Sequence, residues 1–231
     1  MSQPEVVPKT QESIRLWLGL VGVSLASFLT GVDVTLVGIA LPSIQRDFNV
    51  TLAEGSWVIN AYTLSFAALV VTGGKLGDIW GRKRVLLLGF FVFGLGALFA
   101  GVSSNIQVLL MSRAVQGVGA AMMVPGSLAV LTADFYKKNL SLAIGIWGAV
   151  GALGLLVGPI VSGGLTFFYD WRAIFLMNVP IALVAILVAY ITVRESMDLS
   201  IARFVDIFGI ATSAGAIVLL TLTMMASNDY G

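Results

Sequence analysis

Cysteine and histidine are both absent from the 231-residue sequence, and charged side chains are scarce. The absence of cysteine excludes disulfides and thiol chemistry, and the absence of both residue types removes the usual zinc ligands and histidine proton relays. Only 11% of the residues are charged, whereas soluble proteins average about 25%. We therefore expect no soluble globular domain, and a proton carried by a side chain of this sequence must sit on a carboxylate.

Long apolar runs dominate what is present, because 58% of the residues are hydrophobic. About 20 apolar residues are enough for a helix to cross the hydrocarbon core of a bilayer. The first run is too long for a signal-peptide core and no small-residue cleavage site follows it, so we predict a retained helix. The pattern predicts an all-α integral membrane protein with seven spans: Leu16–Leu41, Leu52–Gly73, Val85–Val102, Ile106–Leu131, Leu140–Phe167, Ala173–Val193 and Phe204–Ala226.

Basic residues are distributed unevenly between the two sides that alternating spans define. One side carries only Arg46 and Arg172. Positive charge is retained on the cytoplasmic side of a membrane. We therefore predict a multi-pass protein of the cell membrane with a cytoplasmic N-terminus, on the side that carries Lys9, Arg15, Lys75, Arg82, Lys83, Arg84, Lys137, Lys138, Arg194 and Arg203.

The connections between spans predict four regions along the chain. We expect a cytoplasmic tail at residues 1–13, a six-helix bundle at 14–193, a cytoplasmic linker at 194–203 and a seventh helix at 204–231. Within the bundle, polarity predicts a hairpin loop at Pro42–Ala53 and a basic turn at Lys75–Arg84.

Asp33 and Arg113 are the two full charges well inside predicted spans. A charge at the centre of a membrane helix costs about 2.5–3.5 kcal/mol on insertion scales, so it indicates function by default. At about 1.5 Å per residue, both lie roughly 10–14 Å from the outer ends of their helices. We predict that Asp33 binds a proton or a cationic substrate and that Arg113 sets its charge state. Gln116, three residues after Arg113, is placed to orient the arginine.

A static ion pair that holds the first and fourth spans together is the alternative interpretation of Asp33 and Arg113. The two interpretations differ in whether the charge of Asp33 changes. Desolvation raises the proton affinity of a carboxyl, and a nearby guanidinium lowers it. A change in either would load or unload a proton, whereas a static pair would keep its charge throughout.

The basic turn has the sequence GKLGDIWGRKR, from Gly74 to Arg84. Gly77 and Gly81 permit close backbone approach and positive φ, and Asp78 is placed to cap the third span or to pair with Arg82 one turn later. A simple positive-inside anchor is the alternative, but an anchor does not need an acid and two glycines. The turn has no GxxxxGK[ST] pattern and no preceding strand, so we predict no nucleotide site.

Glycines recur every three or four residues along the predicted fifth span. Small residues on one helix face let backbones approach closely, and Pro159 removes a backbone donor and favours a kink. The alternatives are tight packing inside the chain and packing against a second half of a larger transporter. The glycines of this face are Gly145, Gly148, Gly151, Gly154 and Gly158.

Three residues near the outer end of the predicted second span are lesser candidates. Trp57 at such a position is typical of an interfacial aromatic belt. Asn60 and Tyr62, with Gln116 of the fourth span, are candidates for a substrate cavity.

Seven stretches together resemble the motifs of the major facilitator superfamily, and the combination is similar to its fourteen-span drug:proton antiporters, the EmrB/QacA group. The resemblance runs from about Ser13 to the end of the sequence. The stretches are GKLGDIWGRKR (Gly74–Arg84), LMSRAVQGVGAA (Leu110–Ala121), GAVGALGLLVGPIVSGG (Gly148–Gly164), VDVTLVGIALPSI (Val32–Ile44), WVINAY (Trp57–Tyr62), WRAIFLMNVP (Trp171–Pro180) and FVDIFG (Phe204–Gly209).

The resemblance implies a fold in which the six-helix bundle consists of two inverted three-helix repeats, with a seventh helix beside it. It also implies that the first and fourth spans line one cavity, so that Asp33 and Arg113 face each other. A cytoplasmic gating motif is implied at Gly74, Gly77, Asp78, Gly81, Arg82 and Lys83, and an antiporter motif at Gly154, Gly158, Pro159 and Gly163.

This sequence departs from the family pattern at two of these motifs. Ile79 stands where a basic residue is usual in the gating motif, and Ser162 stands where a glycine is usual in the antiporter motif. The gating motif therefore has fewer charge partners, although its central acid is retained.

We expect a secondary transporter, not an enzyme, that exports amphipathic or cationic compounds in exchange for protons. Its expected partners are a small-molecule substrate, protons, the lipid bilayer and a missing C-terminal half of the same transporter. No cofactor, metal or nucleic acid is expected. The alternatives are a metabolite uniporter or symporter of the same fold, and a complete seven-span membrane protein that does not transport.

Overall fold

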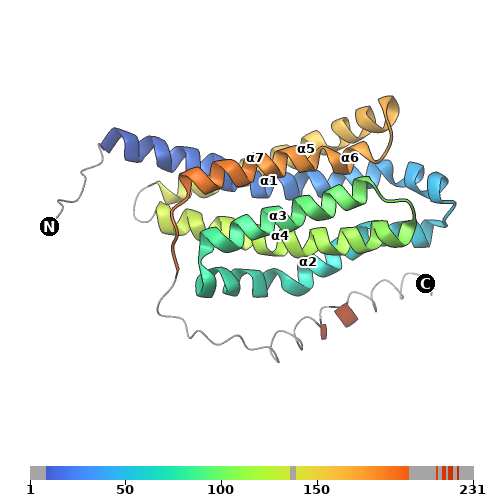
Figure 1. The fold of residues 1–231 in the computed structure, drawn as a ribbon, viewed down its shortest axis with the longest axis horizontal. Coiled ribbons are helices and arrows are strands. Elements are labelled where there is room, and N and C mark those ends of the chain that lie inside the picture. The colour runs from blue at the N-terminus through green and yellow to red at the C-terminus, as the bar shows by residue number, and fades with distance from the viewer. Residues whose placement is uncertain are drawn as a thin grey trace.

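The computed structural model describes residues 9–135, 139–197, 212, 215, 216, 218–220 and 223, and these residues form helices joined by short connections. The helices run alongside one another in a bundle (Figure 1). They are α1 (Lys9–Phe48), α2 (Leu52–Trp80), α3 (Arg82–Gly101), α4 (Ile106–Asp134), α5 (Leu140–Phe168), α6 (Ala173–Leu176) and α7 (Asn178–Thr192).

Six segments of the described chain are long and apolar enough to cross a membrane. The sixth combines the single turn of α6 with α7, so the six agree with the first six predicted spans. The tail before Lys9 and residues 198–203 of the predicted linker lie outside the described residues. The predicted seventh span also lies outside them, apart from seven residues that are helical.

Two predicted loops are much shorter than polarity indicates. α1 continues through Pro42 to Phe48, and α2 begins at Leu52 with a capping box in which Thr51 and Glu54 satisfy each other's backbone N–H groups. α2 then continues to Trp80, and Gly81 alone separates it from α3. The predictions of a loop at 42–53 and a turn at 75–84 are therefore wrong, because polar residues mark where a helix leaves the membrane and not where it ends.

Pro159 does not end or interrupt the fifth span. α5 is one helix from Leu140 to Phe168 with the proline inside it. A proline removes one backbone donor from the helix, and neighbouring helices compensate for such losses inside membranes.

The packed pairs of helices reveal the two repeats. α1 packs against α5 and α7, and α4 packs in the same way against α2 and α3. Two further pairs, α3 with α7 and α1 with α4, are each unchanged when the first three spans are exchanged for the last three. This symmetry is the one expected for two inverted three-helix repeats.

Glycines set the closeness of the main helix contacts. A Cβ atom at Gly89 would lie 2.7 Å from the backbone nitrogen of Met123, and one at Gly96 would lie 2.7 Å from that of Gln116. Lipid tails are as apolar as leucine, so the hydrophobic effect does not drive membrane helices together. They associate instead through such close van der Waals packing. α2 and α5 are the least buried of the long helices, and they leave apolar faces uncovered.

Candidate functional site

Asp33 of α1 and Arg113 of α4 form an ion pair in the middle of the bundle. The guanidinium Nη1 of Arg113 donates to both carboxylate oxygens of Asp33, at 3.0 and 2.8 Å. The side chains are 0% and 1% exposed, respectively. The symmetric packing of α1 on α4 brings the two spans together at this depth, so the expected juxtaposition of the two charges is observed.

Two amides complete the surroundings of the carboxylate. Gln116 accepts a hydrogen bond from Nη1 of Arg113 at 2.6 Å and donates from Nε2 to Asp33 at 2.9 Å. Asn178, the first residue of α7, donates from Nδ2 to the same Asp33 oxygen at 3.4 Å. The Oδ1 atom of Asn178 is buried without a hydrogen-bond partner. Gln116 therefore orients both members of the pair, and Asn178 adds a contact from a third helix.

Arg113 is fixed from its other side by α2 and two aromatic rings. Its Nε donates to the carbonyl oxygen of Val58 at 3.0 Å. The guanidinium carbon lies 4.4 Å from the centre of the Tyr62 ring and 5.6 Å from that of Phe175, both distances at which a cation is attracted to a ring face. Buried charges are tolerated when they are paired and hydrogen-bonded in this way.

The chemistry available to this cluster is the exchange of a proton or a cation at one carboxylate. Protonation of Asp33 would cancel its charge and leave Arg113 with neutral partners. Breaking one side of a buried ion pair is costly, so the charge state of Asp33 is coupled to the packing of α1 on α4. Asp33 is fully buried in this structure, so its carboxylate does not contact solvent.

An open apolar groove of about 370 Å³ lies between α1, α4 and α5, beside the helical turn that precedes Asp33. Its wall includes Thr30 and Gly31 of α1, Val124 of α4 and Trp147 of α5. Tyr62 and Gln116 lie in the charged cluster instead, and the half-buried Asn60 belongs to neither. No sequence pattern predicts this groove, because apolar residues that line a groove look the same in a sequence as residues that face lipid.

At the other predicted site, Asp78 and Arg82 pair across the junction of α2 and α3. Two nitrogens of Arg82 contact Oδ1 of Asp78, at 3.0 Å from Nε and 2.9 Å from Nη2. Gly81 has φ +110°, whereas Gly77 lies inside α2 with helical backbone. Of the two glycines, Gly81 therefore adopts the positive φ that glycine permits, and Gly77 does not. Gly74 packs against the Pro125 ring, 3.4 Å from where its Cβ would stand.

Glu195, in the segment after α7, binds this junction and was not predicted. Its carboxylate accepts from the backbone nitrogen of Lys83 at 3.1 Å and lies 3.5 Å from Nε of Arg84. A side chain at Gly81 would collide with it at 2.6 Å. The ammonium of Lys83 donates to the carbonyl oxygen of Tyr190 at 2.7 Å. A lone acid after a span gives no sequence signal for this contact, because the pairing is long-range.

The glycine face of α5 is directed mainly at α1. A Cβ at Gly154 would lie 2.6 Å from the carbonyl oxygen of Phe28, and one at Gly158 would collide with the Thr35 side chain. Ser162, which replaces a glycine of the family pattern, donates to the carbonyl oxygen of Leu36 at 2.7 Å. In this structure, α1 therefore covers the part of the face around Gly154 and Gly158.

Other small residues of α5 remain uncovered within the described chain. Gly145, Gly148, Gly163 and Gly164 have no atom within 4 Å of a built Cβ. Gly163 is thus separated from Gly154 and Gly158, which pack inside the bundle. Within the predicted antiporter motif, Gly154 and Gly158 are buried, Gly163 is partly buried and Pro159 is exposed.

The chain matches one protein family and several known transport and resistance proteins. The model of the Major Facilitator Superfamily matches residues 23–228. The puromycin resistance protein of Streptomyces alboniger is 41% identical over 174 residues, which are 75% of this chain and 35% of that protein. The riboflavin transporter RibZ of Clostridioides difficile is 31% identical over 215 residues, 93% of this chain and 46% of that protein.

A solved structure of the peptide transporter POT in complex with sulfate shares the fold. It has a TM-score of 0.70 and 15% sequence identity, and the match covers 90% of this chain and 45% of that one. The chain therefore spans less than half the length of these relatives. The family match, the helical bundle and its inverted repeats agree, and this chain belongs to the Major Facilitator Superfamily.

Proposed function

We propose that this protein is part of a proton-coupled exporter of amphipathic or cationic compounds in the cell membrane. The observation that carries the proposal is the buried cluster of Asp33, Arg113 and Gln116, which holds one titratable carboxylate at the crossing of two repeats. A carboxylate inside a membrane protein is expensive, so its position supports a role in ion or proton transfer.

In this proposal, the proton and the substrate use Asp33 in turn. An outward-facing bundle admits a proton to Asp33, which weakens the pair with Arg113 and the contact between α1 and α4. The inward-facing bundle releases the proton to the cytoplasm and takes substrate into the adjoining apolar groove, and the return to the outward-facing state releases that substrate outside. A membrane potential adds about 2.3 kcal/mol per charge per 100 mV to this cycle.

The junction of α2 and α3 has the features of a cytoplasmic gate in this cycle. Asp78 and Arg82 form a short-range pair, and Glu195 ties the junction to the segment after α7. Alternating access requires contacts at one end of the bundle to break while those at the other end form. The cytoplasmic position of this end rests on the excess of basic residues there.

The relatives support export and also a second candidate. Resistance to puromycin in the Streptomyces relative agrees with export of an amphipathic compound. The similarity to a riboflavin transporter favours, as the second candidate, a uniporter or symporter of a metabolite. The two candidates differ in whether an imposed pH gradient of one sign drives the substrate outward.

Transport in inverted membrane vesicles from cells that express the protein tests the proposal, with puromycin, ethidium and riboflavin as probes. We expect puromycin or ethidium to release protons from acidified vesicles that contain the wild-type protein. We expect Asp33→Asn to abolish that release without reducing the amount of protein in the membrane. Asp170→Asn, which removes an exposed carboxylate at the opposite end from the gate, is the matched control and should transport normally.

Two results would contradict the proposal. Normal proton release in Asp33→Asn would remove Asp33 from the coupling step. Movement of riboflavin alone, unaffected by the sign of the pH gradient, would favour the metabolite transporter.

A further inference from the structure

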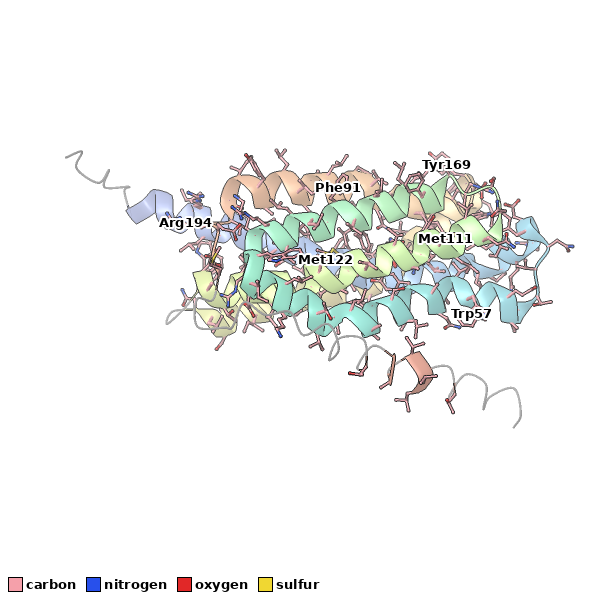
Figure 2. All side chains as sticks on the ribbon, turned by 60° about the horizontal axis from the view of Figure 1, so that its bottom comes forward. Trp57, Phe91, Met111, Met122, Tyr169 and Arg194 are labelled. Atoms are coloured by element: carbon pink, nitrogen blue, oxygen red, sulfur yellow. The ribbon has the colours of Figure 1, made fainter. Side chains whose placement is uncertain are left out.

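A polar cavity of about 210 Å³ lies at the end of the bundle that carries the N-terminal part of α1. Arg194 marks this end in Figure 2, whereas Trp57 and Tyr169 mark the opposite end. The cavity is walled by α1, the C-terminal end of α4 and the segment that follows α7. Its lining residues are Arg15, Leu16, Ala133, Asp134, Thr192 and Arg194.

Among the described residues that line this cavity, two arginines and one aspartate give a net positive charge. The Asp134 carboxylate interacts electrostatically with both Arg194 and Arg15. Nε of Arg15 donates to the carbonyl oxygen of Thr192 at 3.0 Å, which fixes the arginine at the mouth of the cavity. The guanidinium of Arg15 keeps further donors in its planar fork, the geometry that suits a phosphate.

A second, apolar cavity of about 280 Å³ continues from the first along α1 and α7. Arg15 and Thr192 line both cavities, and the second is completed by Ile14, Leu18 and Ile191. These three apolar side chains are all exposed in the bundle. A polar chamber that opens into an apolar groove is complementary to an amphiphile with a charged head and an acyl chain.

The depth of the cavity agrees with the headgroup layer of a bilayer. Ile14, Asp134 and Thr192 are the ends of the apolar segments of α1, α4 and α7 that are long enough to cross a membrane. Trp17 packs edge-on against Phe135, with ring centres 5.7 Å apart, and tryptophan is enriched at the membrane interface. Lipid phosphates occupy this layer.

From these observations we infer that the Arg15–Arg194 cavity binds one anionic phospholipid of the cytoplasmic leaflet. The phosphate of a phosphatidylglycerol would contact the two arginines, the glycerol hydroxyls of its head would donate to Asp134, and one acyl chain would follow the groove of Ile14, Leu18 and Ile191. Basic pockets between helices on the cytoplasmic side are known to take anionic headgroups. The assignment to the cytoplasmic leaflet rests on the orientation in the proposed function, whereas the lipid class does not.

Native mass spectrometry of the protein purified from its own membranes in detergent tests this inference. Phosphatidylglycerol, phosphatidylethanolamine and phosphatidylcholine with identical acyl chains are added in turn. We expect one tightly retained phosphatidylglycerol, and we expect Arg15→Gln to weaken its binding about fivefold, as for one arginine at an anionic surface. Arg46→Gln, which removes an exposed arginine at the opposite end of α1, is the matched control and should bind the lipid normally.

Each other result overturns the inference. Equal retention of phosphatidylcholine would mean that only the groove binds lipid, and equal retention of phosphatidylethanolamine would mean that net charge is not recognised. Displacement of the lipid by millimolar inorganic phosphate would identify a free anion as the occupant. If the wild-type protein retains no lipid and its thermal unfolding is unaltered, the inferred lipid does not occupy the cavity, and another segment of the protein fills it. Because lipid retention is measured without transport, its failure is distinguishable from failure of the proposed export.

Discussion

At the residue scale, the Asp33–Arg113 pair is compatible with both interpretations of its sequence: a static ion pair, and a carboxylate whose charge state changes. It is a structural contact between α1 and α4, and it is also the only carboxylate–guanidinium pair that the described helices bury completely. Both interpretations rest on the energetics of a buried ion pair. A buried pair is tolerable while intact, and it becomes unfavourable when either member loses its charge.

We expect Arg113→Gln to lower the free energy of unfolding by about 3–5 kcal/mol, because it leaves the Asp33 carboxylate buried and unpaired. The double variant Asp33→Asn with Arg113→Gln should recover much of this loss, since both charges are then absent. Thermal unfolding in detergent measures both effects. If the double variant is as unstable as the sum of the two single variants, the two charges are energetically independent.

At the element scale, glycine has two different tasks in this protein, and its sequence spacing does not distinguish them. Gly154 and Gly158 let α5 approach α1, whereas Gly145 and Gly148 have no neighbour within 4 Å. Periodicity correctly predicted a shared helix face. Which part of that face is covered depends on the path of α1, and a sequence pattern within α5 contains no information about it.

Gly154→Ala should separate α5 from α1, because the added methyl group would meet the carbonyl oxygen of Phe28 at 2.6 Å. Overpacking of this kind costs about 1–3 kcal/mol. Gly148→Ala is the matched variant on the same helix, and we expect no loss of stability from it. Thermal unfolding of the two proteins compares them, and equal stability would show that the α1–α5 contact adjusts freely.

The junction between α2 and α3 gives a second pair of matched glycines. Gly81→Ala should destabilise the protein by about 1–3 kcal/mol, the typical cost of holding a side chain in a strained backbone conformation. Its φ is +110°, and the new methyl group would also meet the Glu195 carboxylate. Gly77→Ala lies in a helix with its nearest neighbour at 3.9 Å, so it should be neutral or slightly stabilising. A thermal unfolding series that ranks the two variants the other way would contradict the geometry.

At the scale of the whole molecule, the fold gathers the segments predicted to be cytoplasmic at one end of the bundle. The N-terminal part of α1, the α2–α3 junction and Arg194 share one end, and Trp57 near the start of α2 and Tyr169 after α5 share the other (Figures 1 and 2). At that other end, Arg172 binds Asp47 at 2.9 Å and the carbonyl oxygen of Ser103, so the C-terminal end of α1 is tied to the α3–α4 and α5–α6 connections. Each end of the bundle is thus held by its own set of ion pairs.

The orientation can be measured with single cysteines, because this sequence contains none. We expect a membrane-impermeant maleimide to label Ser104→Cys on intact cells, and to label Trp80→Cys only after the membrane is permeabilised. Both positions are exposed in the bundle. The reverse labelling pattern would overturn the predicted cytoplasmic N-terminus, which follows from the distribution of arginine and lysine.

The sequence by itself determined the class of the protein, its six described spans and the two charges at its centre. Hydrophobic length and the cost of buried charge are local quantities, so residues such as Asp33 and Arg113 stand out without a structure. Only the tertiary structure decided which partners these residues have. The contacts of Asn178 with Asp33 and of Glu195 with the α2–α3 junction join positions far apart in the chain. Those contacts depend on how the two repeats pack, and neither composition nor periodicity encodes that packing locally.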